Sequence, residues 1–189
     1  MSEADIPSVS ILHDGDYAGQ VRGCVQLELA VRTPIMITLQ QVNESNWRRT
    51  LALTVHPAQQ RFIADYVPIA AIALAKAYIR PSGMTWIPYA IFANQQMVGF
   101  VEIALEPGQP KDCWVFHFFI DHRFQGHGYG KAAVHALVAM IREIEPNCTG
   151  ISLVVHPENV AAQYLYQSVG FEATGEEQWG EPAYRLGFE

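Results

Sequence analysis

The sequence predicts a mixed α/β domain in which helices flank a central, mostly antiparallel sheet. Three strand-like runs follow one another at Trp86–Ala93, Met97–Leu105 and Cys113–Asp121. Their connections are short and rich in turn residues, which predicts an antiparallel meander. A strand–loop–helix pattern, a strand–helix pattern and a closing hairpin come next. A chain of 189 residues with this order of elements is typical of a single layered α/β domain.

The segments before the meander predict an edge strand and two helical regions. Ile35–Val42 reads as a strand, and Asn43 is a suitable N-cap for a short helix towards Leu51. Ala58–Ile79 has a helical composition that is interrupted at Pro68. Residues 1–33 stand apart as an extension of unknown role, with alternating apolar residues at 25–31 that indicate a strand. The main domain is therefore expected to span residues 34–189.

The segments after the meander predict two more helices, a strand and a hairpin. Apolar residues recur at helical spacing on one face of the first helix: Val134, Leu137, Val138 and Ile141. Ile151–Val155 is a short buried strand. Asn159 is a suitable N-cap for the second helix, and Gly170 ends it. Phe171–Glu177 and Ala183–Phe188 then form a closing hairpin.

Composition excludes several classes of protein. With 50% hydrophobic and 16% charged residues the chain is long enough to bury a sizeable core. Its net charge of −7 argues against a nucleic-acid-binding surface. The longest apolar run, Val67–Ala75, is too short to span a bilayer, and no secretory signal precedes it. Three scattered cysteines are typical of a reduced compartment, so a cytoplasmic protein is expected.

The segment Gln125–Lys131 has the composition of a phosphate-binding loop. Glycines at 126, 128 and 130 follow an apolar run and precede a helix, so backbone N–H groups can approach an anion at the helix N-terminus. A Walker A loop does not fit, because position 125 is Gln and position 132 is Ala. A Rossmann fingerprint does not fit either, because its third glycine falls on Lys131.

Two motifs in this chain resemble those of one enzyme superfamily. The spacing of Gln125, Gly128 and Gly130 resembles the acyl-CoA pyrophosphate loop of the GNAT superfamily of N-acetyltransferases, Q/R-x-x-G-x-G/A. About 30 residues later, the segment from Asn159 to Phe171 resembles the pattern N-x-x-A-x-x-L-Y-x-x-x-G-F of the same superfamily. The resemblance runs from about Ile35 to the C-terminus. It implies a GNAT-like fold and acetyl-CoA as the co-substrate.

Finer details resemble the bacterial spermine/spermidine acetyltransferase group within that superfamily. The matching segments are Glu44–Trp47, Gln60–Ala64, Val98–Phe100, Phe119–Asp121, Thr174–Glu176 and Gly180–Glu181. This likeness implies that a polyamine such as spermidine or spermine is the acceptor. Acetylation of another small amine (an amino acid or an aminoglycoside) or of a protein N-terminus remains an alternative. A non-catalytic acyl-CoA sensor, and assembly into a homodimer or larger homo-oligomer, also remain open.

The resemblance implies a set of residues that bind the co-substrate. The strand Cys113–Ile120 and the strand Ile151–Val155 are expected to splay apart, with the pantetheine arm between them near Phe119 and Ile120. Asn159 is expected to contact the arm while it caps its helix. Backbone N–H groups are expected to hold the pyrophosphate at Gln125, Gly126, His127, Gly128, Tyr129, Gly130 and Lys131.

Tyr166 is the candidate general acid. It lies seven residues after Asn159, so both project from nearly the same helix face. A phenol can protonate the thiolate that leaves when an amine attacks the thioester. Tyr164 points elsewhere on the helix and is expected to pack. A buried aromatic role for Tyr166 is the structural alternative.

The general base is left open between several groups. Glu102 lies in mid-strand, where a carboxylate is costly unless it is paired or functional, and it is the first candidate. His117, Asp121 and a water relay are the rivals. Carboxylates for a cationic acceptor could come from Glu44, Asp65, Glu102 and Asp112. The histidines lack metal-ligand spacing, so no metal is expected.

Overall fold

The computed structural model describes residues 35–64, 66–108 and 112–188. The extension at residues 1–33 and its predicted strand lie outside these residues. Within the described ranges, none of the helices combines the length and the apolar character needed to cross a bilayer.

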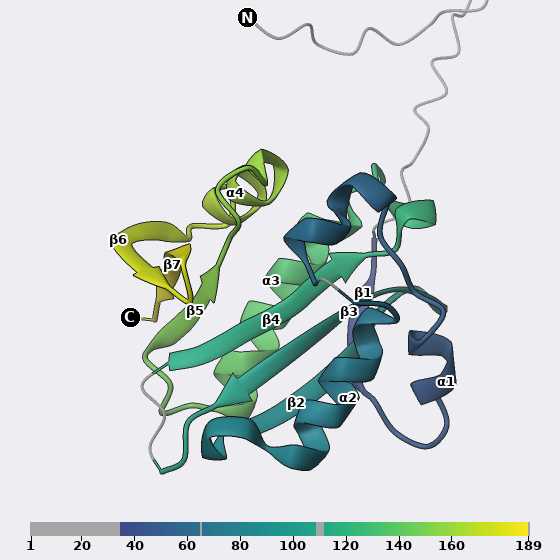
Figure 1. Ribbon diagram of the computed structural model, residues 1–189, viewed down its shortest axis with the longest axis horizontal. Coiled ribbons are helices and arrows are strands. Elements are labelled where there is room, and N and C mark those ends of the chain that lie inside the picture. Colours follow the sequence, from purple (N-terminus) through teal and green to yellow (C-terminus); the bar gives the residue numbers. More distant parts are fainter. Residues whose placement is uncertain (1–34, 65, 109–111, 189) are drawn as a thin grey trace, which may run out of the picture. The chain divides into compact units, whose positions relative to one another are not determined.

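Seven strands form one mixed sheet in the described residues, in the order β1-β2-β3-β4-β5-β7-β6 (Figure 1). Neighbouring strands are antiparallel, except that β4 and β5 run parallel. This arrangement confirms the predicted meander, the buried strand and the closing hairpin. The strands are β1 Ile37–Gln41, β2 Thr85–Ala93, β3 Gln96–Leu105, β4 Asp112–Ile120, β5 Gly150–Val154, β6 Glu172–Gln178 and β7 Glu181–Gly187.

Helices cover both faces of the sheet, with α2 on one face and α3 on the other (Figure 1). The core under α3 includes Val101, Val134 and Ile141, all of them fully buried or nearly so. A second core under α2 includes Ala73 and Phe100. The helices are α1 Trp47–Thr50, α2 Ile69–Ile79, α3 Tyr129–Ile144 and α4 Val160–Gln167.

The early helical region differs from the sequence-based expectation. The short helix α1 begins at Trp47 with Asn46 at its N-cap, whereas Asn43 was predicted as the cap. Asn43 instead accepts hydrogen bonds from the backbone N–H and hydroxyl groups of Ser45, which makes a turn before the helix. The segment predicted as one interrupted helix becomes a 3₁₀ helix at Pro57–Phe62 and the separate helix α2, because Pro68 cannot continue a helix.

Pairing between β4 and β5 is short. Among the residues that the structure describes, it joins Asp112–Trp114 to Gly150–Ser152, and β4 then continues to Ile120 without β5 beside it. Figure 1 shows the two strands diverging from this end. The register of β4 against β3 also shifts near His117, whose φ of 50° marks a bulge. The predicted splaying of these strands is therefore present.

Carboxylates hold each end of β4, with Asp112 partly buried and Asp121 fully buried. At the start, Asp112 accepts two 2.8 Å hydrogen bonds from Arg185 of β7 and a 2.6 Å bond from Ser152 of β5. Beyond the end, Asp121 accepts from Arg123 and from the backbone N–H of Thr54 at 3.0 Å. Burial alone would raise the pKa of each carboxyl, but these hydrogen bonds lower both pKa values on balance. Both groups are therefore ionised anchors of the fold.

Gly99 lets β3 approach the end of β4, where it pairs with Ile120. A Cβ atom at position 99 would overlap the carbonyl oxygen of Phe119. We expect Gly99→Ala to destabilise the domain by about 1–3 kcal/mol, because the overlap forces the two strands apart. Urea unfolding measures this change.

Gly187→Ala is the matched control, since its added Cβ meets only the end of the Arg185 side chain, at 3.2 Å. It should change stability by less than about 0.5 kcal/mol. Equal effects of the two substitutions would show that close packing of β3 on β4 is not required.

Candidate active site

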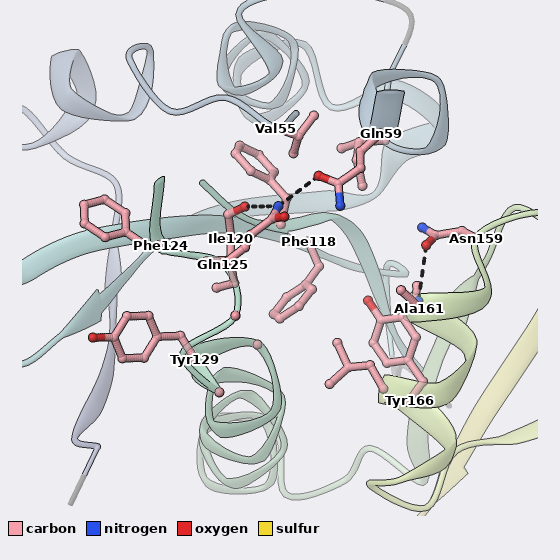
Figure 2. A pocket seen from close by; sticks show the side chains of 17 residues that line it. Val55, Gln59, Phe118, Ile120, Phe124, Gln125, Tyr129, Asn159, Ala161 and Tyr166 are labelled. Atoms are coloured by element: carbon pink, nitrogen blue, oxygen red, sulfur yellow. Dashed lines mark hydrogen bonds between the residues drawn. The ribbon is translucent and has the colours of Figure 1, made fainter. Parts of the chain in front are cut away.

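A pocket of about 300 Å³ lies where the loop after β4, the 3₁₀ segment and α4 come together (Figure 2). Its walls come from three parts of the chain that are far apart in sequence, at residues 55–63, 118–130 and 159–166. The end of β4 supplies Phe118–Ile120, the glycine-rich loop supplies Gly126, Gly128 and Gly130, and α4 supplies Asn159 and Tyr166. The pocket therefore joins the two motifs that the sequence places about 30 residues apart.

The glycine-rich loop opens α3 with unpaired backbone donors. Gly126 and Gly128 have φ values of 79° and 80°, a conformation that other residues rarely adopt. Gly128 is the N-cap of α3, and the first helical hydrogen bond comes from the N–H of Ala132. The N–H groups of the first turn, at residues 129–131, are therefore free of helical partners and carry the positive end of the helix dipole. Such an end can bind a phosphate group.

The side chains of this loop lie in different places. Gly126, Gly128, Tyr129 and Gly130 line the pocket, whereas His127 and Lys131 are exposed and do not. The His127 ring stacks on Tyr129, with 5.6 Å between their centroids. In this conformation the side chains of His127 and Lys131 therefore do not contribute to the pocket wall.

Gln125 has a structural contact that the sequence does not reveal. Its side-chain amide donates to the carbonyl of Ile120 at 2.9 Å and to Oε1 of Gln59 at 3.0 Å (Figure 2). The side chain thus ties the loop to the end of β4 and to the 3₁₀ segment. Gln59 lies in the pocket wall but was absent from the predicted site. No local signal marks it, because its contact spans 66 residues of sequence.

Asn159 caps α4 as predicted. Its Oδ1 accepts a 3.2 Å hydrogen bond from the N–H of Ala162. It also lines the pocket, so its amide nitrogen faces a region where a ligand can lie. Phe119 and Ile120 line the same pocket from β4, beyond the point where β5 pairing stops. These three predicted residues are therefore brought together.

A second pocket of about 200 Å³ lies between the diverging ends of β4 and β5. Phe116 and His117 line it from β4, Val154 lines it from β5, and Glu181 lines it from β7. Phe118 and Tyr166 line both this pocket and the first one. The two pockets therefore share a wall at these rings.

Tyr166 is held firmly at that shared wall. Its side chain is only 7% exposed, and its ring lies 6.1 Å from Phe118 and 5.4 Å from Phe171, centroid to centroid. Burial raises the pKa of its phenol, so the group keeps its proton at neutral pH. Tyr164, by contrast, is 70% exposed on the outer side of α4, away from both pockets. The structure thus separates the two tyrosines as the helical spacing predicts.

Glu102 is fully buried and lines neither pocket. Among the described residues, neither of its carboxyl oxygens has a hydrogen-bond partner. Burial raises the pKa of Glu102 to about 8, and the positive charge of Lys76 opposes this effect. An unsatisfied buried carboxyl group costs free energy, so a functional reason is expected for it.

His117 lies between Glu102 and the second pocket. Its Nε2 is 3.8 Å from the Glu102 carboxylate, 3.2 Å from Nζ of Lys76 and 3.3 Å from the hydroxyl of Tyr66. Burial, with the charge of Lys76, lowers the pKa of His117 to about 4, so the ring is neutral at pH 7. Of the two groups, only His117 contacts the second pocket.

The other predicted carboxylates do not form one site. Asp121 and Asp112 both form ion pairs with arginine side chains at the ends of β4. Neither carboxylate lines either of the two pockets, so neither can act there as a base. Glu44 is exposed near α1, and Asp65 lies outside the described residues. Within the ranges that the structure describes, no group of three histidine, cysteine or acidic side chains could hold a metal ion.

Several pocket residues were not among the site residues predicted from the sequence. Val55, Gln59 and Ile63 come from the segment before α2, and Phe124 and Leu165 add apolar surface. The segment Gln60–Ala64 resembles the spermine/spermidine acetyltransferase group and so indicated this region. The resemblance did not identify which of its residues face the pocket. Which side chains of an irregular segment face a ligand depends on how that segment packs on β4.

Comparisons with known proteins agree with this arrangement. The Acetyltransferase (GNAT) family matches residues 39–171. Spermine/spermidine N(1)-acetyltransferase of Bacillus subtilis (strain 168) is 30% identical over 149 residues, which is 74% of this chain and 90% of that protein. An uncharacterized N-acetyltransferase of the same strain, YycN, is 28% identical over 150 residues, which is 74% of this chain and 94% of YycN.

Solved structures show the same fold. Aminoglycoside acetyltransferase AAC(6')-Ib in complex with coenzyme A aligns with a TM-score of 0.62 at 20% identity, over 79% of this chain and 93% of that one. Spermidine N-acetyltransferase from Vibrio cholerae in complex with CoA and spermine aligns with a TM-score of 0.61 at 18% identity, over 79% and 92% of the chains. With the family match and the B. subtilis relative, they show that this chain belongs to the GNAT family and is an acetyl-CoA-dependent N-acetyltransferase.

Proposed function

We propose that this enzyme transfers the acetyl group of acetyl-CoA to a primary amine of a polyamine such as spermidine or spermine, in the cytoplasm. The observation that carries the proposal is the pair of pockets that meet at Tyr166. One pocket is then the donor site and the other the acceptor site, so both substrates can meet at one side chain. The B. subtilis relative, named for spermine and spermidine, supports the choice of acceptor.

In the proposed donor site, the backbone of the glycine-rich loop binds the pyrophosphate of acetyl-CoA. The first-turn N–H groups of α3 supply donors and the helix dipole supplies positive potential. The arm of the co-substrate then follows the unpaired edge of β4 past Phe118–Ile120, with Asn159 on the opposite side. Apolar side chains such as Val55 and Leu165 bury the arm.

In the proposed reaction, the acceptor amine attacks the thioester carbonyl and the C–S bond breaks. Tyr166 donates its phenolic proton to the departing thiolate sulfur, which gives neutral CoA. Its raised pKa ensures that the phenol holds this proton, and its burial fixes the ring between the two pockets. The phenolate then recovers a proton from solvent or from the acceptor.

In the proposed relay, neutral His117 takes the proton that the amine must lose and passes a proton to the ionised form of Glu102, which requires the two side chains to approach from 3.8 Å to hydrogen-bond distance. His117 faces the acceptor pocket, and Glu102 lies 3.8 Å behind it. With a pKa near 8, Glu102 is a carboxylic acid at lower pH and a base at higher pH. The pair thus moves the proton away from the pocket without placing a carboxylate in contact with the thioester.

Another small amine is the second candidate acceptor. An aminoglycoside acetyltransferase shares the fold, but a fold shared at 20% identity does not choose a substrate. A purely binding role is disfavoured, because a sensor needs no proton donor where the two pockets meet.

The donor site predicts the effect of a substitution in the loop. Gly128→Val should weaken CoA binding at least tenfold, because a β-branched residue strains a position with φ of 80° and displaces the loop N–H groups. Isothermal titration calorimetry with CoA measures the affinity. Gly130→Ala is the control, since its added Cβ meets Leu165 at an ordinary 3.7 Å. An unchanged Kd for Gly128→Val would contradict the phosphate-binding role of the loop.

The proposed acid predicts a kinetic separation. Tyr166→Phe should lower kcat with spermidine by about 10²-fold, because the thiolate loses its proton donor. Affinity for acetyl-CoA should stay within about threefold, because the ring is retained. Thiol release with a panel of amines measures turnover, and Tyr164→Phe serves as the control. Full activity of Tyr166→Phe would rule out the acid role, and failure of all amines would refute the proposed function.

The buried carboxyl group predicts two pH dependences. The pKa of Glu102 is raised from 4.5 to about 8 in the folded state, so folding favours its protonated form. The contribution of Glu102 to stability should therefore fall as pH rises from about 4.5 to about 8 and then level off, whereas the lowered pKa of His117 contributes an opposing rise up to about pH 6.5, so the difference between wild type and variant isolates the Glu102 part. Glu102→Gln should remove this fall and be more stable above pH 8, by roughly 1–3 kcal/mol.

The same substitution tests the base. The ratio of wild-type kcat to Glu102→Gln kcat should rise with pH up to about 8, because wild-type Glu102 becomes ionised over this range. Protonation of the acceptor amine affects both enzymes equally, so it does not change the ratio. Urea unfolding and steady-state kinetics at matched pH values provide both measurements. A ratio that stays flat with pH would exclude Glu102 from proton transfer and leave it a purely structural group.

A further inference from the structure

Four aromatic rings form a cluster on the face of the sheet that α2 covers. Trp86 comes from β2, Trp114 and Phe116 come from β4, and Trp179 comes from the turn between β6 and β7. Their centroids are 4.9 Å apart for Trp86 and Phe116, 5.5 Å for Phe116 and Trp179, and 5.1 Å for Trp114 and Trp179. We refer to these four residues as the aromatic cluster.

Trp179 is the exposed member of the cluster. It is 65% exposed although it is the largest type of apolar side chain. Its φ of 53° is unusual for a bulky residue, and Gly180 beside it has a φ of 82°. The turn thus accepts backbone strain in a conformation that lays the indole against Trp114 and Phe116. A two-residue hairpin turn between Gln178 and Glu181 requires φ > 0 at both central positions, and Asn, Asp or Gly meets this requirement at lower cost than Trp, so the choice of an indole here needs a reason.

The cluster continues directly from the proposed acceptor pocket. Phe116 lines that pocket and also contacts Trp179 and Trp86. Glu181, two residues after Trp179, lines the same pocket from β7. An extended molecule with one end at Tyr166 could therefore pass Phe116 and reach Trp179.

The cluster already holds an ammonium group of the protein itself. Nζ of Lys76 lies 4.5 Å from the ring centroid of Trp86 and 5.2 Å from that of Phe116, within the range of cation–π attraction. Its charge acts on the buried Glu102. These contacts show that the rings of this cluster present faces that stabilise an ammonium ion.

Charge on the hairpin favours a second cation at the exposed end. Glu176, Glu177 and Glu181 flank Trp179, and no lysine or arginine occurs between residues 172 and 184. The negative potential of these carboxylates and the π face of Trp179 both attract cations and repel anions. The occupant that fits both is an ammonium group on a flexible apolar chain.

We propose that Trp179, Phe116 and Glu181 bind a second ammonium group of the acceptor while its reacting amine lies beside Tyr166. This subsite rests on the proposed function and deepens it, because it selects amines with two or more charges. A monoamine of the same chain length reaches Tyr166 but gains nothing at Trp179. The subsite therefore acts on KM for the acceptor and leaves acetyl-CoA binding unchanged.

The test measures the steady-state kinetics of three acceptors, n-butylamine, 1,4-diaminobutane and spermidine. Each acceptor is assayed with the wild-type enzyme and with two variants of Trp179. Trp179→Leu keeps an apolar side chain but removes the π face, whereas Trp179→Phe keeps a π face. In Trp179→Leu, KM for the diamine and for spermidine should rise about five- to tenfold, while kcat/KM for n-butylamine stays within about twofold. Trp179→Phe should keep KM for both within about threefold.

Matched controls separate the subsite from general effects. Tyr164→Leu replaces another exposed aromatic side chain, on α4, and should leave KM for all three amines unchanged. Glu181→Gln should raise KM for spermidine more than KM for n-butylamine, about threefold or more. Thermal melting verifies that each variant folds, which is expected because Trp179 is exposed.

Each outcome decides between the proposals. Equal loss for n-butylamine and for spermidine in Trp179→Leu would overturn the subsite, since apolar packing alone would explain it. Unchanged KM values in Trp179→Leu would overturn the subsite and leave the proposed function standing. Absence of turnover with any amine in the wild-type enzyme would overturn the proposed function and the subsite together.

Discussion

The short pairing of β4 with β5 is the constraint on which the site depends. Among the residues that the structure describes, β4 and β5 pair only at Asp112–Trp114, where the Asp112 carboxylate also ties them to β7 through Arg185. Beyond this point β4 keeps β3 on one side and exposes its other edge. Such an edge offers unpaired N–H and C=O groups that a ligand can satisfy. Both pockets border this edge, so the divergence of the two strands creates the space that we assign, as a proposal, to the two substrates.

Three carboxyl groups along the sheet, two of them fully buried and Asp112 partly buried, have different environments and different pKa shifts. Asp112 and Asp121 are fully engaged by arginine side chains and other donors, and their lowered pKa values stabilise the fold at neutral pH. Glu102 lies on β3 between these anchors, without a hydrogen-bond partner among the described residues and with a raised pKa. Its burial works against stability at neutral pH. This cost is the reason why we propose that Glu102 exchanges protons with its neighbour His117.

The two halves of the site rest on different kinds of structure. The proposed donor half offers backbone groups of a helix N-terminus and a strand edge, which can bind a phosphate chain and an extended arm without particular side chains. The acceptor half depends on side chains from β4, α2 and the β6–β7 turn, which meet only in the folded protein. Under this proposal, a change in the β6–β7 turn alters the choice of amine while the donor half and Tyr166 remain as they are.

The sequence by itself determined the order of elements, the glycine-rich loop and the alignment of Asn159 with Tyr166, because local periodicity and backbone freedom fix these features. It did not determine Gln59 as a pocket residue, the true start of α1, or the distance of Glu102 from the pockets. Those facts follow from contacts such as Gln59 with Gln125, across 66 residues, which leave no local pattern. Tertiary structure alone decided that Asp112 and Asp121 are anchors, because a carboxylate's role depends on which cations the fold brings to it.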